Sequence, residues 1–109
     1  MRVQIPETVN RNCYVFQMGY TYPLLIWDRF NMYKAEKMLL QNFGEPAKED
    51  HFSFPNRVRL YCRDQESDIL NRRWYVGQRR WKRAKNPTYD FWMVFKSQKD
   101  RTLALMLLE

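Results

Sequence analysis

The residues of this chain that are best suited to bind a ligand lie in one short segment, residues 72–85. The segment has seven basic side chains and no acidic one, whereas basic and acidic residues cancel over the rest of the chain. It therefore accounts for the whole formal net charge of +7. Its basic residues are Arg72, Arg73, Arg79, Arg80, Lys82, Arg83 and Lys85, and its large rings are Trp74, Tyr75 and Trp81.

This mixture of side chains predicts contact with a nucleic acid, either DNA or RNA. Guanidinium and ammonium groups bind phosphates, and aromatic rings stack on bases. In an extended strand Trp74 would point into the core, which leaves Tyr75 facing outward among the arginines, with Trp81 partly exposed. Two alternatives remain. The rings could be core residues beneath a solvated basic face, or the patch could bind an acidic protein surface.

A second basic run precedes this segment and could extend it. Arg57, Arg59 and Arg63 alternate with Val58, Leu60 and Cys62, which predicts a strand with one basic and one apolar face. Between residues 57 and 83 every basic residue except Lys82 is arginine, whose planar guanidinium makes bidentate phosphate contacts. If the two strands are neighbours in a sheet, Arg57 and Arg59 join the binding surface.

No constellation of residues predicts catalysis. Asp64, Glu66 and Asp68 could hold a Mg²⁺ ion, but clustered carboxylates in a polar loop are more often solvated. His51 has no nucleophile or orienting partner at a recognisable spacing. Phosphate-binding, dinucleotide-binding and zinc-binding motifs are missing from the sequence. We expect a protein without enzymatic activity, metal or cofactor; a nuclease is the least favoured alternative.

The composition predicts one domain, residues 1–109, that begins with a polar arm, residues 1–11. The chain is 45% hydrophobic and 17% aromatic, which is enough for a packed core. Its two cysteines, Cys13 and Cys62, are expected to be free thiols, although a bridge between neighbouring strands is an alternative. The first residues lack the apolar region of a signal peptide, and the longest apolar run, residues 23–27, cannot span a membrane. We expect a cytoplasmic protein with no membrane partner.

In the first half of the chain the pattern predicts one strand and one long helix. The strand covers residues 13–18, and residues 20–23 form a turn or extended connection. The helix covers residues 28–43, with Asp28 as its N-cap and Gly44 and Pro46 after its end. Its expected buried face consists of Phe30, Tyr33, Lys37, Leu40 and Phe43.

In the second half the pattern predicts strands followed by a short helix. An acidic loop covers residues 45–51, and a strand interrupted near Pro55 covers residues 52–62. The basic segment is expected to be a strand, with a bulge permitted at Gly77; a helix beginning near Asp68 is the alternative. Residues 89–95 form a strand with two apolar faces. Asp100 caps a helix that ends at Leu108 and buries Leu103, Met106 and Leu107. The order predicts an α+β domain, an antiparallel sheet of about four strands with one long helix and a short C-terminal helix.

The last third of the chain resembles the ends of small uncharacterised tailed-bacteriophage proteins. The resemblance rests on Trp74, Trp81, the run Phe91-Trp92-Met93-Val94-Phe95, and the run Lys99-Asp100-Arg101-Thr102-Leu103-Ala104-Leu105. It implies a viral origin, because these phage proteins mostly have no assigned function. Together with the basic segment it suggests a phage regulatory protein that binds nucleic acid. The alternative is a phage protein-interaction module, either an inhibitor of a host protein or a virion component.

Overall fold

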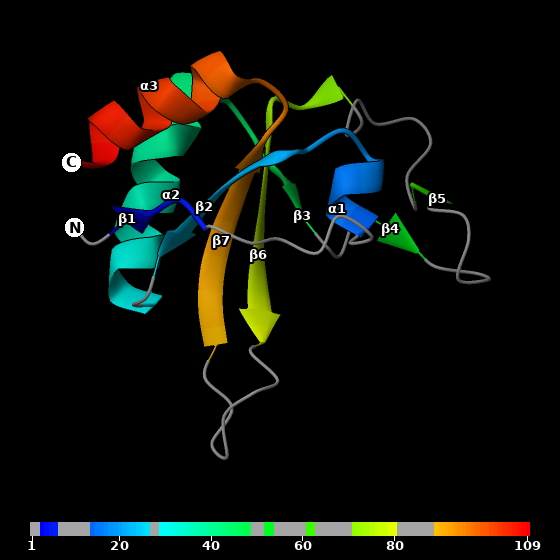
Figure 1. Ribbon diagram of the computed structural model, residues 1–109, viewed down its shortest axis with the longest axis horizontal. Helices are drawn as coiled ribbons and strands as arrows, with labels where there is room; N and C mark the ends of the chain where they lie inside the picture. The colour runs from blue at the N-terminus through cyan, green and yellow to red at the C-terminus, as the bar shows by residue number, and fades with distance from the viewer. Residues whose placement is uncertain are drawn as a thin grey trace.

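The structure, a computed structural model, describes residues 3–6, 14–26, 29–48, 52–53, 61–62, 71–80 and 89–109. These residues form an α+β domain in which two helices cover one face of a five-stranded sheet (Figure 1). The predicted fold class is therefore confirmed. The sheet differs from the expectation in having five strands and one parallel pair.

The strands of the main sheet lie in the order β1-β2-β7-β6-β3, so β7 is the central strand. All neighbours are antiparallel except β3 and β6, which are parallel. A separate two-stranded sheet pairs β4 with β5. The strands are β1 Val3–Gln4, β2 Tyr22–Ile26, β3 Ala47–Lys48, β4 Phe52–Ser53, β5 Tyr61–Cys62, β6 Trp74–Arg80 and β7 Tyr89–Phe95; the helices are α1 Tyr14–Gln17, α2 Arg29–Phe43 and α3 Gln98–Leu108.

Residues 74–80 of the basic segment form strand β6, as predicted, and the helical alternative is wrong for these residues; residues 81–85 lie outside the described residues. The register of β6 with β7 runs without interruption from Trp74↔Phe95 to Arg80↔Tyr89 and passes through Gly77↔Trp92. The bulge permitted at Gly77 is therefore absent from this ladder. Strand β7 has the predicted bounds, and its two apolar faces are explained by its central place in the sheet.

Apolar side chains are buried on both faces of the sheet. Helices α2 and α3 cover one face, where Leu24, Leu39, Trp74, Met93 and Phe95 form part of one core cluster. The opposite face has a second cluster, covered by α1 and the turn after it: Val15, Tyr20, Leu25, Ala47, Tyr75, Trp92 and Val94. Alternate residues of β6 and β7 therefore belong to different cores.

Helix α2 agrees with the predicted helix in extent, but among the described side chains its buried face shares only Phe43 with the predicted one. It ends at Phe43, and the next residue, Gly44, has a φ of 79° that suits a residue without a side chain. The buried residues are Met32, Ala35, Leu39 and Phe43, while the expected core residues Tyr33 and Leu40 are 62% and 38% exposed. The predicted face followed the largest side chains, whereas the observed face includes the small Ala35. Lys37 is also exposed, Asp28 is not among the described residues, and the side chain of Phe30 is not described.

Helix α3 begins earlier than predicted because Ser97, not Asp100, is its N-cap. The Ser97 hydroxyl accepts a 3.1 Å hydrogen bond from the Asp100 amide in the first turn. The buried residues of this helix are Ala104 and Leu108. The expected core residues Leu103 and Met106 are instead 42% and 69% exposed, and Leu107 is half-buried.

The largest departures from the expected elements lie in the first half of the chain. Residues 14–17 form the short helix α1, where a strand was predicted from β-branched and aromatic residues. Gly19 closes that helix with a φ of 94°, and its amide donates to the Phe16 carbonyl at 3.0 Å. Strand β2 includes Pro23, which made this segment resemble a turn. Because β1 pairs only with Leu25 and Ile26, the described chain has no strand beside Pro23 on that side.

Four short strands, β1, β3, β4 and β5, also correct the sequence predictions. Strand β1 lies within the expected polar arm, and β3 lies within the expected acidic loop. The predicted strand at 52–62 instead has its two ends paired with each other, Phe52 with Cys62. Of the two cysteines, Cys13 is outside the described residues, and the side chain of Cys62 is not described. Among the helices of the described chain, none is long and apolar enough to cross a membrane.

Candidate nucleic-acid interface

The end of the β6–β7 hairpin extends past the neighbouring strands of the sheet (Figure 1). Strand β3 pairs with β6 only as far as Val76, and β2 pairs with β7 only as far as Phe91. Beyond these positions β6 and β7 pair with each other alone within the described chain, through Arg79↔Asp90 and Arg80↔Tyr89. We call these four residues the distal ribbon. The hairpin therefore places two consecutive arginines at the outermost described pairs of the sheet.

Arg72, at the start of the basic segment, makes contacts that belong to the fold. Its Nη1 donates a 2.8 Å hydrogen bond to the Pro46 carbonyl, next to β3. Its own carbonyl accepts a 2.9 Å bond from the hydroxyl of the buried Tyr20. Burial raises the pKa of Tyr20 to about 12, although the nearby Arg72 charge opposes this shift. Arg72 thus connects both flanks of the sheet to the start of β6.

Arg73 is also engaged within the domain. Its Nη2 and Nε donate to the two carboxylate oxygens of Asp100 at 2.7 and 3.1 Å. Its guanidinium carbon lies 4.8 Å from the centre of the Phe43 ring. The Asp100 hydrogen bonds are the main reason that the Arg73 pKa is raised, which favours its charged form. This bidentate pair joins the first turn of α3 to the beginning of β6 and to the end of α2.

The two rings at the start of β6 are both buried. Trp74 has no exposed surface, as predicted, and its Nε1 donates to the Gly44 carbonyl at 2.8 Å. Tyr75 was expected to face outward among the arginines, but it is fully buried in the second core cluster. Its ring centre lies 6.0 Å from that of Tyr20. The correction follows from the sheet, because β6 is covered on both faces and neither side of its first half is open to solvent.

The other predicted binding residues either have no described side chain or lie outside the described residues. Arg79 and Arg80 lie in the distal ribbon, but their side chains are not described. The remaining predicted contacts lie outside the described residues, and these are Arg57, Arg59, Trp81, Lys82, Arg83 and Lys85. The same holds for His51 and for the carboxylates Asp64, Glu66 and Asp68. Within the part of the chain that is described, no three His, Cys, Asp or Glu side chains are grouped in a way that could hold a metal ion.

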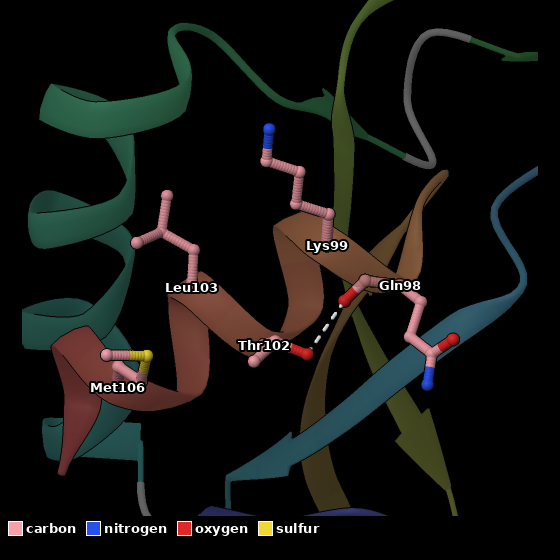
Figure 2. Close-up of a pocket in the computed structure, with 5 residues that line it drawn as sticks. All are labelled: Gln98, Lys99, Thr102, Leu103 and Met106. Atoms are coloured by element: carbon pink, nitrogen blue, oxygen red, sulfur yellow. Dashed lines mark hydrogen bonds between the residues drawn. The ribbon is translucent and has the colours of Figure 1, made fainter.

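Helix α3 also has an exposed surface that the sequence pattern did not indicate. Gln98, Lys99, Thr102, Leu103 and Met106 line an open depression of about 470 Å³. Figure 2 shows Leu103 and Met106 on the side of α3 that lies next to α2, with Lys99 above them. Thr102 donates a 2.9 Å hydrogen bond to the Gln98 carbonyl one turn earlier in the helix. The surface is apolar with a basic end, because the helix buries Ala104 and Leu108 instead of its larger side chains.

Comparison of the chain with protein-family models, curated proteins and solved structures found no match. A function must therefore be argued from the chemistry of these surfaces.

Proposed function

We propose that this protein binds nucleic acid without catalysis, through the distal ribbon and the basic residues that follow it. The observation that supports the proposal is the extension of β6 and β7 past β2 and β3, with Arg79 and Arg80 at the last two positions of β6. Lys82, Arg83 and Lys85 follow in the sequence with no acidic residue among them. Several basic side chains in so short a segment suit the closely spaced phosphates of a nucleic acid.

The described contacts change which residues of the basic segment carry the proposal. Arg72 and Arg73 hydrogen-bond to Pro46 and Asp100 and hold the hairpin in place. Tyr75 is buried, so its ring cannot stack on a base while the domain is folded. The proposal therefore rests on the last five basic residues of the segment, and Arg72, Arg73 and Tyr75 support them indirectly. The resemblance to tailed-bacteriophage proteins suggests a phage regulator as the biological setting.

The second candidate is a protein-interaction module that binds an acidic protein surface, as an inhibitor of a host protein or a virion component. One observation favours it, the apolar and basic surface of α3 with Leu103 and Met106 exposed. Surfaces of this composition are typical of protein contacts. The two candidates differ because a nucleic-acid-binding protein should co-purify with material that absorbs at the nucleic-acid maximum.

The test removes charge from the proposed interface and measures the salt dependence of DNA binding. In the variant, Arg79, Arg80, Lys82 and Arg83 are each replaced by Gln. For duplex DNA, each phosphate contact that is lost should flatten the plot of log affinity against log salt by about 0.9. The matched control removes the same charge from the helices by replacing Lys34, Lys37, Lys99 and Arg101 with Gln.

We expect the ribbon variant to lose affinity and salt dependence and the helix control to retain both. An unchanged slope in the ribbon variant would place the binding site elsewhere. If the parent protein binds neither DNA nor RNA at moderate salt, the proposed function fails and the protein-interaction candidate takes its place.

A further inference from the structure

We infer that the distal ribbon enters the major groove of double-stranded DNA. This inference rests on the proposed function and specifies its ligand. It depends on three features of the described chain: the width of the hairpin end, its attachment to the core, and the burial of the rings at its start.

The first feature is that, among the described residues, the distal ribbon consists of only two strands. Within the described residues, Arg79↔Asp90 and Arg80↔Tyr89 have no third strand on either side. Paired strands lie about 4.8 Å apart. The major groove of B-form DNA is about 12 Å wide and about 8.5 Å deep, and it admits a two-stranded ribbon. The full sheet, with five strands side by side, could not enter such a groove.

The second feature is that the opposite end of the same hairpin is fixed to the domain. Trp74 stacks at 6.4 Å between ring centres on Phe95, its register partner in β7, and its Nε1 donates to the Gly44 carbonyl. Arg73 holds Asp100 by two hydrogen bonds. Because this end of the hairpin is already ordered in the domain, binding requires no further ordering of it, which favours insertion of the two strands as a preformed pair.

The third feature favours a double-stranded ligand over a single-stranded one. Proteins that bind single strands present exposed rings on which bases stack. Trp74 and Tyr75, two of the three large rings in the basic segment, are fully buried. Two of the four residues of the distal ribbon are arginines, and arginine suits both phosphates and the acceptor edge of guanine in the major groove. Duplex RNA is disfavoured because its major groove is too deep and narrow to be entered.

The experiment compares three probes of one sequence: duplex DNA, duplex RNA and single-stranded DNA. The parent protein should bind duplex DNA most tightly, by about tenfold or more, which corresponds to ~1.4 kcal/mol. Replacing Arg79 and Arg80 with Gln should weaken duplex binding and lower the salt slope by about 0.9 for each lost contact. Replacing Lys34 and Lys37 with Gln removes the same charge from α2 and should change neither.

The outcomes separate this inference from the proposed function. If single-stranded DNA or duplex RNA binds as tightly as duplex DNA, the groove inference is wrong and the proposed function stands. If none of the three probes binds, the proposed function itself is wrong. If the arginine variant melts earlier than the parent, the unchanged protein is tested on duplex DNA whose cytosines carry a bulky sugar in the major groove. Equal binding to this DNA and to plain DNA overturns the inference.

Discussion

The two ends of the β6–β7 hairpin belong to the same pair of strands but have different surroundings. At the root, residues 74–76 and 92–95, side chains are buried on both faces between two clusters. At the distal ribbon no neighbouring described strand remains. Along β6 the buried Val76 is followed, after Gly77 and Gln78, by Arg79 and Arg80. This comparison shows that the residues of one basic segment need not all have the same role. Its first part holds the fold together, and its last part extends from it.

The largest expected effect on stability comes from removing a buried ring at the root of the hairpin. Two single variants, Trp74→Ala and Tyr75→Ala, should each have a free energy of unfolding about 3–5 kcal/mol lower than the parent, because both rings are fully buried. Chemical denaturation measures the change, and duplex DNA binding by the folded fraction should stay at the parent level. If Tyr75→Ala leaves stability unchanged but weakens binding, the ring faces solvent and the contrast between root and ribbon is wrong.

A smaller effect is expected where the root meets the ribbon, at Gly77. A Cβ atom added there would lie 2.8 Å from Cε1 and 3.0 Å from the hydroxyl oxygen of Tyr75. Because the Tyr75 ring is fully buried, it has little room to move away. Gly77→Ala should therefore destabilise the domain by about 1–3 kcal/mol. Combining it with Tyr75→Ala should remove the clash, so the double variant should cost less than the sum of the two; additive costs would contradict the close contact.

The smallest expected effect concerns Tyr20, which connects the second core to the root. Tyr20→Phe removes the hydrogen bond to the Arg72 carbonyl and should cost about 0.5–1.5 kcal/mol at neutral pH. The folded pKa is raised to about 12 from the usual 10.0, so the unfolded chain loses this proton first. The stability contributed by the neutral phenol is present below pH 10 and lost as the pH rises toward 12.

The pH dependence of the Tyr20→Phe variant gives the check. Its free energy of unfolding, measured from neutral to alkaline pH, should fall less steeply than that of the parent above pH 10. If the free energy of unfolding falls equally steeply with pH in the two proteins, Tyr20 ionises as a solvent-exposed tyrosine does. That result would contradict its place in the second core.

The sequence predicted elements better than it predicted the faces that those elements bury. Helix α2 and strand β7 have strong periodicity or strong strand formers, and their extents were predicted closely, while β6 was predicted as a strand without close bounds. The buried side of α2 was missed because Leu39 and Leu40 are neighbours of the same type, and only the position of the sheet decides between them. Tyr75 was misplaced because alternation predicts opposite faces for Trp74 and Tyr75 but does not show that both faces are covered.

Local chemistry explains the other errors. Strand β2 was not predicted because it contains Pro23, and proline normally interrupts a sheet. Here Pro23 is accommodated because the neighbouring strand β1 is short and pairs only with Leu25 and Ile26. Ser97 and Asp100 are both good N-caps, and the cap is settled only by the hydrogen bond that the structure shows. For the candidate site, the sequence located the charge but could not show that Arg72 and Arg73 have partners 26 and 27 residues away.

The central position of β7 has a consequence for how this chain folds. Strands β2 and β6 are both joined to β7, and β2 pairs with residues about 70 positions later in the chain, from Ile26↔Phe91 to Tyr22↔Phe95. Contacts between such distant residues close large loops and slow folding. During synthesis, β1, β2, β3 and β6 all leave the ribosome before the strand that unites them. The five-stranded sheet therefore cannot assemble until β7 has emerged, and until then β2 and β6 offer unpaired edges to other nascent chains.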